Sequence, residues 1–422
     1  MKILWFTNTP CGASKKLYGK NLVSGGWLYS LSEEIKKKST IDLHIAFYWG
    51  ERINPFSFEG ITYHPMYRSG DNSVWGRYIR RIKNAISHSI DDEDINKCSD
   101  LINDIDPDLI HIHGSEENFG LVAGCIRHKK ILLSIQGLLN PCFDKLYSGF
   151  PESEFLKQES FLHKLLFDGV KANRIRFKRK AQREKKIFSL ISNVVGRTEW
   201  DSSCSLALNP NRKYYVVNEI LREEFYNTCW IPRHEKQSFI IVTTISSGLY
   251  KGLETIYRTA EILNKSNIPF LWKVIGISSK DNYTNLTESI LELSCLDLNI
   301  QLLGRKNASE MVEILLESDV FVQVSHIENS SNSLCEAMLL GMPIVSTFAG
   351  GTSSMLKDKI EGILVQEGDS YSLAGTLIKI KNNPDPYIDL AKNARIRAIQ
   401  RHNPNIVVNE LLQTYKTILD DK

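Results

Sequence analysis

Several features that mark large protein classes are missing or scarce in this sequence. Only eight of the 422 residues are cysteines, scattered with no C-x-x-C pair, which disfavours disulfides or zinc and favours reduced thiols. The opening MKILWFTNTP holds too short an apolar run for a signal peptide, and no stretch approaches the roughly 18 apolar residues that span a bilayer. Formal net charge is +3, so attraction for anions must come from local patches. These absences predict a cytoplasmic protein without a bound metal.

What is present is an alternation of strand-like and helix-like segments. At 422 residues the chain exceeds what one core usually serves, so we expect two domains of roughly 200 residues each. The first half has six strand-like runs, of which KILWFTN is the first and KYYVVNE the last. The second half has five, from FIIVTTIS to PIVST, and helical segments such as GLETIYRTAEILNK separate the runs. This alternation predicts two doubly wound α/β domains with parallel sheets.

The boundary between the halves is expected in the stretch FYNTCWIPRHEKQSF, residues 225–239. It has no sustained period and contains Pro232. We therefore predict an N-terminal domain over 1–228 and a second domain over 229–404. In such sheets ligands bind beyond the carboxyl ends of the strands, so the predicted binding site is a cleft between the domains.

Residues 326–343, HIENSSNSLCEAMLLGMP, carry two acids, Glu328 and Glu336. On one continuous helix they would lie about 80° apart, so a break between them is favoured. The pattern predicts a strand end, the loop ENSSN, and a helix that ends at Gly341. Free amides and the positive helix dipole at the start of that helix would suit a phosphate.

Each acid also has a structural interpretation. Ser333 and Glu336 form S-x-x-E, a capping box in which the glutamate need only bond the backbone amide of the N-cap residue, and this stands at even odds with a ligand role. A lone acid such as Glu328 is often merely solvated. Its place beside a phosphate-type loop favours a functional role.

These residues carry a resemblance to a known family. Glu, seven residues and Glu, followed by AMLLGMPIVST and GGTSSMLKDKIEGILVQEGD, resemble the donor-site signature of family 4 glycosyltransferases of the GT-B fold. SGGWLYSL resembles their glycine-rich loop, and IHIHG, SIQGLLNPC and VVGRTEWD are similar to a subgroup from bacterial surface polysaccharide clusters. The resemblance implies two Rossmann-like domains facing across a cleft, with a C-terminal helix, residues 405–422, crossing back to the first.

The resemblance also implies roles for individual residues. Glu328 would contact the donor sugar near its reacting face, and Glu336 would hold the ribose hydroxyls. Lys251, otherwise an ordinary exposed lysine, would neutralise the departing diphosphate, an interaction that strengthens in the transition state. Further expected donor-side residues are Asn332, Ser333, Leu334, Ser246, Gly276, Arg305, Gln136 and Gly26, and expected acceptor-side residues are His113 and Gly25.

The chain departs from the family pattern in two places. Ile245 and Ser246 stand where members commonly carry a Gly-Arg pair, so one cation of the phosphate clamp is missing, and Arg197 or Arg305 would have to substitute. Gln136 stands where many members have histidine, and glutamine cannot serve as a base. This favours direct front-face displacement with retention at the anomeric carbon. The same changes are compatible with an inactive member.

Two other motifs have simpler interpretations. DIDPD, residues 104–108, contains D-x-D, but it precedes a strand and is rich in turn residues, so a solvated turn is favoured over a metal site. His111 and His113 alternate along the next strand and share one face. We expect His113 to meet the acceptor and His111 to be buried and hydrogen-bonded.

The strongest local charge lies in KANRIRFKRKAQREKKIF, residues 171–188, with nine basic residues and one acid. Such a helix is a membrane-surface contact, an anion-binding face or simply a solvated face, and lipid phosphate of an acidic leaflet would contribute about 1 kcal/mol per basic residue. Residues 73–86, SVWGRYIRRIKNAI, mix aromatic and basic side chains similarly. Both fit a lipid-linked acceptor at the inner membrane face, whereas no motif supports nucleic acid.

The sequence therefore predicts a retaining glycosyltransferase for bacterial surface polysaccharide. Its co-substrate would be a UDP- or GDP-linked sugar, its acceptor a lipid-linked saccharide, and no cofactor or metal is expected. The protein would be cytoplasmic or peripheral at the membrane. The alternatives are a nucleotide-sugar epimerase of the same fold and a degenerate, non-catalytic nucleotide-binding member of an assembly complex.

Overall fold

The computed structural model describes residues 1–19, 26–68, 76, 89–158, 169–233 and 238–421. The chain forms two compact units. The first unit comprises residues 1–144, 159–220 and 403–422, and the second comprises residues 145–158 and 221–402. Gly25 and most of segment 73–86 lie outside the described residues.

The unit boundaries differ from the sequence-based ones at 228 and 404. The second unit begins earlier because α10 (Glu223–Tyr226) packs on α13 (Ala308–Leu316) and α14 (Asn332–Leu340), with Phe225 fully buried. Residues 145–158 belong to the second unit although first-unit residues flank them in the chain. Local sequence carries no sign of that long-range contact.

The first unit is built on an eight-stranded sheet in the order β3-β4-β2-β1-β5-β6-β7-β8, parallel except for β3 with β4. All six predicted strands are present, and β3 and β4 are additional. Pro65 interrupts the pattern of β4, since proline cannot donate to a ladder. The strands are β1 (Lys2–Thr7), β2 (Asp42–Trp49), β3 (Phe56–Phe58), β4 (Ile61–Tyr67), β5 (Leu109–His113), β6 (Lys130–Ser134), β7 (Asn193–Gly196) and β8 (Lys213–Val216).

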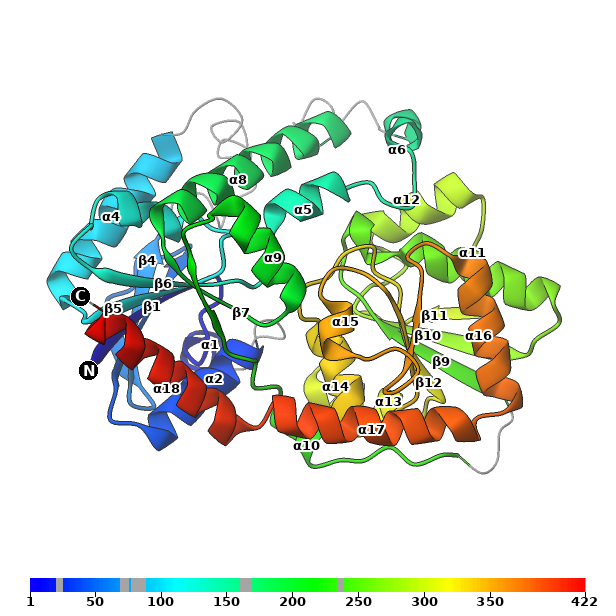
Figure 1. Ribbon diagram of the computed structural model, residues 1–422. Coiled ribbons are helices and arrows are strands. Elements are labelled where there is room, and N and C mark those ends of the chain that lie inside the picture. The colour runs from blue at the N-terminus through cyan, green and yellow to red at the C-terminus, as the bar shows by residue number, and fades with distance from the viewer. Residues whose placement is uncertain (20–25, 69–75, 77–88, 159–168, 234–237, 422) are drawn as a thin grey trace. The chain divides into compact units, whose positions relative to one another are not determined.

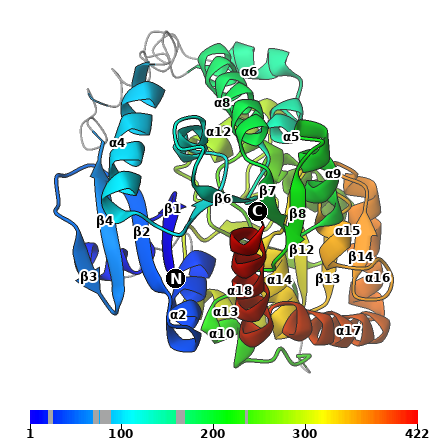
Figure 2. The same cartoon turned by 60° about the vertical axis from the view of Figure 1, so that its left-hand side comes forward.

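Helices cover both faces of the first sheet, as Figures 1 and 2 show. In β1, Ile3 and Trp5 face one core and Leu4 and Phe6 face the other, all fully buried, as expected of a central parallel strand. One core holds α2 (Gly26–Lys38) and α18 (Pro404–Asp420), and the other holds α4 (Ser89–Ile105), η1 (Phe119–Gly124) and α8 (Val170–Leu190). The remaining helices are α1 (Ala13–Tyr18), α5 (Leu139–Asp144) and α9 (Glu199–Leu208).

The C-terminal helix α18 belongs to the first unit. It lies beside α2 (Figure 1), although the two are far apart in the chain. Trp5 Nε1 donates a hydrogen bond of 3.0 Å to Tyr415 Oη inside this contact, so a polar pair fixes the helix over the sheet.

The second unit is built on a six-stranded, wholly parallel sheet in the order β11-β10-β9-β12-β13-β14. One face of this sheet packs against α11, α12 and α16, and the other face packs against α10, α13, α14 and α17. The five predicted strands are present, and β14 is additional. The elements are α6 (Glu152–Gln158), β9 (Phe239–Thr244), η2 (Leu249–Lys251), α11 (Leu253–Lys265), β10 (Phe270–Ile275), α12 (Asn282–Leu291), β11 (Ile300–Leu302), β12 (Val320–Gln323), β13 (Ile344–Thr347), α15 (Thr352–Met355), β14 (Ile363–Val365), α16 (Ser370–Asn382) and α17 (Asp385–Arg401).

Two parallel-sheet α/β units, the predicted fold class, are thus confirmed. Within the described part of the chain, no helix combines the length and the apolarity that crossing a bilayer requires.

Candidate functional site

The carboxyl ends of β9 and β12 bring Lys251 and Glu328 together in the second unit. Lys251 Nζ donates to Glu328 Oε1 at 2.5 Å, and Ser325 Oγ donates to the same oxygen at 2.9 Å. Both charged side chains are largely buried, with 19% and 14% of the side chain exposed. The two residues expected to carry the chemistry are therefore direct partners, and the lysine neutralises the carboxylate.

The glycine pair after β13 supports the backbone of Glu328. Gly350 has φ +53°, and a Cβ at this position would lie 2.0 Å from the Glu328 carbonyl oxygen. Gly351 N–H donates to the same oxygen at 2.9 Å. A side chain at Gly350 would therefore displace the segment that holds Glu328.

Helix α14 begins beside Glu328 and leaves its first amides open. The first intrahelical bond runs from Cys335 N–H to the Ser331 carbonyl, at 3.1 Å, so the N–H groups of Asn332, Ser333 and Leu334 have no acceptor within the helix. Ser331 is the N-cap residue, and its side chain makes no capping bond. The capping box of Ser333 and Glu336 is therefore wrong, because the helix starts earlier than that interpretation assumed.

Glu336 instead pairs with Arg222. Arg222 Nε and Nη2 donate to Glu336 Oε1 and Oε2, both at 2.7 Å, in a bidentate contact. Burial raises the pKa of Glu336, and the Arg222 guanidinium opposes that rise. The sequence analysis did not single out Arg222 as a partner of Glu336.

A second, buried pair joins the same two chain segments as the Lys251–Glu328 contact. His326 Nε2 and Glu254 Oε1 lie 2.6 Å apart, with neither side chain more than 5% exposed. Residues 145–158 pack on this pair, since a Cβ at Gly149 would fall 2.4 Å from the Glu254 carboxylate. Because His326 and Glu254 flank the Glu328 and Lys251 segments, the pair fixes the two segments to each other.

The remaining predicted donor-side residues of the second unit follow other strands. Gly276 comes directly after β10 and donates its N–H to the Gly304 carbonyl at 2.8 Å. Ser246 and Arg305 are exposed after β9 and β11. Hydrogen bonds from Ser278 lower the pKa of Asp281, and Arg305 adds to that effect, so Arg305 lies near this acid.

In the first unit, β5 carries the two predicted histidines. His111 contacts Ser134 Oγ and Tyr415 Oη, each at 2.7 Å, which confirms that it is buried and hydrogen-bonded. His113 is also buried and lies against Trp5, with ring centroids 4.5 Å apart. Among the described residues neither nitrogen of His113 has a hydrogen-bond partner. Burial lowers the pKa of His111 to about 3 and holds the pKa of His113 well below its usual value.

The other first-unit predictions lie on neighbouring elements. Asn8 Nδ2 donates to Gln136 Oε1 at 3.3 Å beyond the ends of β1 and β6, and Gly26 begins α2. Arg197, a suggested substitute cation, lies over the Trp27 ring and pairs with Glu219 at 3.3 Å. It is therefore already engaged within the first unit.

Glu116 is a first-unit acid that sequence reasoning missed. Its Oε1 accepts a hydrogen bond from Gly137 N–H at 3.0 Å, while its buried Oε2 has no partner among the described residues. Burial raises the pKa of Glu116 to about 7. It follows His113 by three residues in GSEEN, where nothing in the local pattern distinguishes it from its neighbour Glu117.

Comparison with solved structures places the fold in the GT-B class. Sucrose-phosphate synthase from Thermosynechococcus elongatus is 13% identical with a TM-score of 0.74, and the match covers 100% of both chains. Anabaena HepE, solved in complex with UDP and glucose, is 14% identical with a TM-score of 0.65, covering 99% of this chain and 100% of that one.

Residues 230–397 match the family model described as Glycosyl transferases group 1, so the second unit carries a glycosyltransferase family domain. A curated relative, the capsular polysaccharide biosynthesis glycosyltransferase CapM of Staphylococcus aureus, is 23% identical over 209 residues, 50% of this chain and 52% of that protein. The matches span 30–54% of the length of these curated relatives.

Proposed function

We propose that the protein is a retaining glycosyltransferase of family 4 that transfers a sugar from a UDP- or GDP-linked donor to a saccharide acceptor during synthesis of a bacterial surface polysaccharide. One observation carries the proposal. Lys251 and Glu328 meet at the carboxyl ends of β9 and β12, beside the open first turn of α14, within the segment that matches the group 1 family model.

Each donor group has a matching partner in this site. The donor diphosphate would accept hydrogen bonds from the amides of Ser333 and Leu334, with Lys251 stabilising the charge that grows as the nucleotide leaves. Glu328 would accept from the sugar hydroxyls and Glu336 from the ribose. HepE was solved with UDP and glucose, which supports a nucleotide-sugar donor for this fold.

The environment of Glu328 favours front-face displacement. Its Oε1 already accepts hydrogen bonds from Lys251 and Ser325, so the carboxylate is suited to hold hydroxyl groups and poorly suited to act as a nucleophile. Gln136, the residue in place of the common histidine, supplies no base. Direct displacement, with the acceptor entering on the side from which the nucleotide leaves, retains the anomeric configuration.

The acceptor would be bound by the first unit. At the end of β5 the ring nitrogens of His113 have no partner among the residues that the structure describes, and α8 presents a row of basic side chains. A lipid-linked saccharide would use both features, and it would place the protein at the inner face of the membrane. The capsular polysaccharide role named for CapM supports the expected pathway class.

A donor panel followed by a transfer assay tests the proposal. UDP, GDP and their sugars are first ranked by the rise in melting temperature that binding causes, and the best donor is then offered with a panel of lipid-linked acceptors. We expect Lys251→Ala and Glu328→Gln to lower kcat at least about 100-fold with the fold intact. The control Lys273→Ala breaks an ion pair with Glu317 in the same unit and should keep full activity.

Near-parental turnover in Lys251→Ala or Glu328→Gln would refute the assigned roles, and an inverted product anomer would refute retention. Donor conversion without any acceptor would instead indicate an epimerase. Nucleotide binding with no turnover across the panel would indicate a non-catalytic protein.

A further inference from the structure

Two short segments of the second unit, one leading into α11 and one following β12, are joined by several contacts. Lys251 and Glu328 form the ion pair of the candidate site, and His326 and Glu254 form the buried pair, 2.6 Å apart. The His326 N–H also donates to the Tyr250 carbonyl at 2.8 Å. Glu254 follows Lys251 by three residues and His326 precedes Glu328 by two, so a shift at the buried pair is passed on to the ion pair through very little backbone.

The backbone around the lysine is closely packed. Gly252 has φ +80°, and a Cβ there would lie 2.1 Å from the Val324 carbonyl oxygen. Tyr283 Oη accepts a hydrogen bond from the Leu253 N–H at 3.0 Å and donates to the Leu249 carbonyl at 3.2 Å, so it spans the turn that carries the lysine. Because this turn is rigid, a change at one of its contacts alters where the ammonium group lies.

A polar pair is an expensive way to join two buried segments. Glu254 Oε1 accepts a second hydrogen bond, from Thr255 Oγ1 at 2.9 Å, but Oε2 is buried and has no hydrogen-bond partner in the part of the chain that the structure describes. Apolar side chains of similar volume often give equal or better stability than a buried ion pair. Polar groups that break this rule are expected where function requires a fixed geometry.

Two glycines lie against the pair and help to exclude water from it. A Cβ at Gly149, in the segment 145–158, would fall 2.4 Å from the Glu254 carboxylate, and a Cβ at Gly368 would fall 3.5 Å from the His326 ring. At most 5% of either side chain of the pair is exposed. In such surroundings a hydrogen bond is electrostatically stronger than in water, so the pair favours one arrangement.

We propose that His326 and Glu254 are positioning residues that hold the Lys251 ammonium where the departing diphosphate of the donor develops its charge. A lysine needs such support because its ammonium is a point charge on a flexible four-carbon stem. Reacting groups must be held within about 0.5 Å of the productive geometry, and supporting side chains supply that precision. The inference rests on the proposed function, and it adds a task for a pair that acts through Lys251.

Two substitutions at one position of the full chain separate positioning from charge. Glu254→Met and Glu254→Gln both remove the carboxylate, but only glutamine keeps an oxygen that accepts a hydrogen bond from His326. The readout is the affinity for UDP, GDP and their nucleosides in calorimetry, because the free diphosphate carries the charge that the leaving group acquires. We expect Glu254→Met to weaken binding of the preferred diphosphate at least about tenfold and of its nucleoside less than about twofold. Glu254→Gln should restore the diphosphate affinity to within about threefold of the parent.

A double-mutant cycle with Lys251→Ala tests whether the pair acts through the lysine. In that background Glu254→Met should weaken diphosphate binding by less than about a further twofold, since the group that the pair positions is gone. His326→Leu, which cannot donate to Glu254, and His326→Gln, which can, repeat the comparison from the other side of the pair. Melting temperatures close to the parent's show which variants fold.

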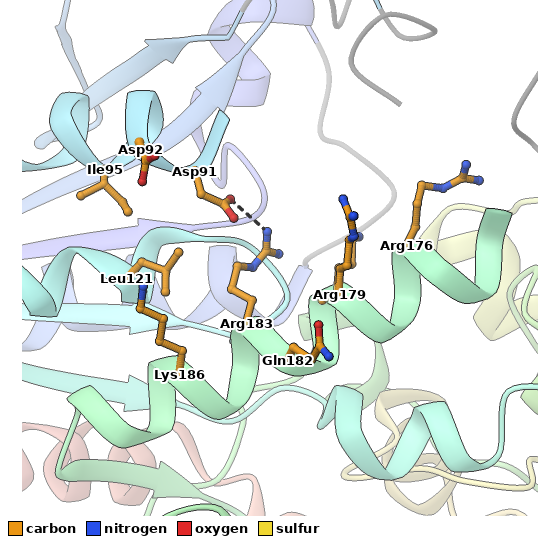
Figure 3. Close-up of a pocket in the computed structure, with 10 residues that line it drawn as sticks. Asp91, Asp92, Ile95, Leu121, Arg176, Arg179, Gln182, Arg183 and Lys186 are labelled. Atoms are coloured by element: carbon orange, nitrogen blue, oxygen red, sulfur yellow. Dashed lines mark hydrogen bonds and ion pairs between the residues drawn. The ribbon is translucent and has the colours of Figure 1, made fainter. Parts of the chain in front are cut away.

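Two controls remove buried contacts elsewhere. Tyr257→Phe, on the same helix as Glu254, removes a hydrogen bond of 3.0 Å to Glu288. In the first unit, Asp91→Asn alters the contact with Arg183 beside a cavity of about 310 Å³, which Figure 3 shows. Both controls should keep the diphosphate affinity within about twofold of the parent.

Equal losses in Glu254→Met and Glu254→Gln would overturn the inference, as would full additivity of Glu254→Met with Lys251→Ala. Failure of the parent to bind either nucleotide would overturn both the inference and the proposed function. Nucleotide binding needs no turnover, so a chain that shows the expected coupling but transfers no sugar would refute the proposed function and leave the positioning of Lys251 standing.

Discussion

Replacing Arg222 by glutamine tests the pairing that surrounds Glu336. The variant leaves a carboxylate with 4% of its side chain exposed and removes the guanidinium that bonds both of its oxygens. Removing one partner of a buried ion pair costs about 3–5 kcal/mol. Arg222 is 21% exposed, and solvent therefore screens part of the interaction, so we expect about 3 kcal/mol. For a unit of this size the melting temperature should fall by about 6–12 °C.

The same variant should make nucleotide binding depend on pH. Burial raises the pKa of Glu336 and Arg222 opposes this, so the pKa rises further in the variant. Ribose hydroxyls donate to an ionised carboxylate, so UDP affinity should be weakest at acid pH and recover as pH rises through that pKa. For stability the sign is reversed. A carboxyl with a raised folded-state pKa favours the folded state at low pH, so the stability deficit of the variant should grow as pH rises above about 4.3.

Arg233→Gln is the matched control. Arg233 pairs with Asp319, and the exposed side-chain fractions are 25% and 3%, close to those of the Arg222–Glu336 pair. Asp319 precedes β12, at the opposite end of the strand from Glu328. Both variants should lose similar stability in urea unfolding, but only Arg222→Gln should weaken UDP binding, by about tenfold in calorimetry at pH 6. Equal UDP affinities, or a pH-independent loss, would refute this account of Glu336.

Three further substitutions address other parts of the molecule. Gly350→Ala should lower stability by about 1–3 kcal/mol and reduce kcat at least tenfold, because its Cβ would collide with the Glu328 carbonyl; Gly375→Ala, in open space on α16, should retain activity. Glu116, with a pKa of about 7, binds a proton more readily in the folded state than in the unfolded state. Its contribution to the free energy of unfolding therefore falls by up to about 3 kcal/mol as pH rises from about 4.3 to 7. Glu116→Gln should remove that slope from unfolding free energies measured across this range, and an unchanged slope would contradict the burial argument. Ser333→Ala should change stability by less than about 0.5 kcal/mol in urea unfolding, because its side chain is not the helix cap.

Much of the fold follows from local sequence because buried parallel strands need continuous apolar runs. KILWFT, DLHIAFYW and FIIVTT are such runs, and each forms a strand. Gly341 likewise marked the end of α14, where it adopts the left-handed conformation. The sequence pattern did not predict the strand β4, because Pro65 interrupts it, yet the residues of β4 pair with β2. Local propensity was outweighed there by tertiary pairing.

The candidate site was only partly predictable. The spacing of Glu328 and Glu336 pointed to a strand, a loop and a helix, and the family resemblance added Lys251. The partner of Glu336 lies 114 positions away in the chain, and no local pattern encodes such a contact. The burial of Glu116 could not be predicted for the same reason, since burial depends on how distant segments of the chain pack.

The two acids of the motif therefore stand in different electrostatic settings. Glu328 shares Lys251 with the expected donor diphosphate, so donor binding should transfer the ammonium from carboxylate to phosphate while sugar hydroxyls take its place at Glu328. Arg222 has no such competing task, and the free lone pairs of Glu336 can accept ribose hydroxyls with the guanidinium in place. Because Ser246 supplies no cation, the proposed role of Lys251 predicts that it would carry more of the phosphate neutralisation than in proteins with the Gly-Arg pair. Its removal should accordingly slow transfer more than removal of either acid.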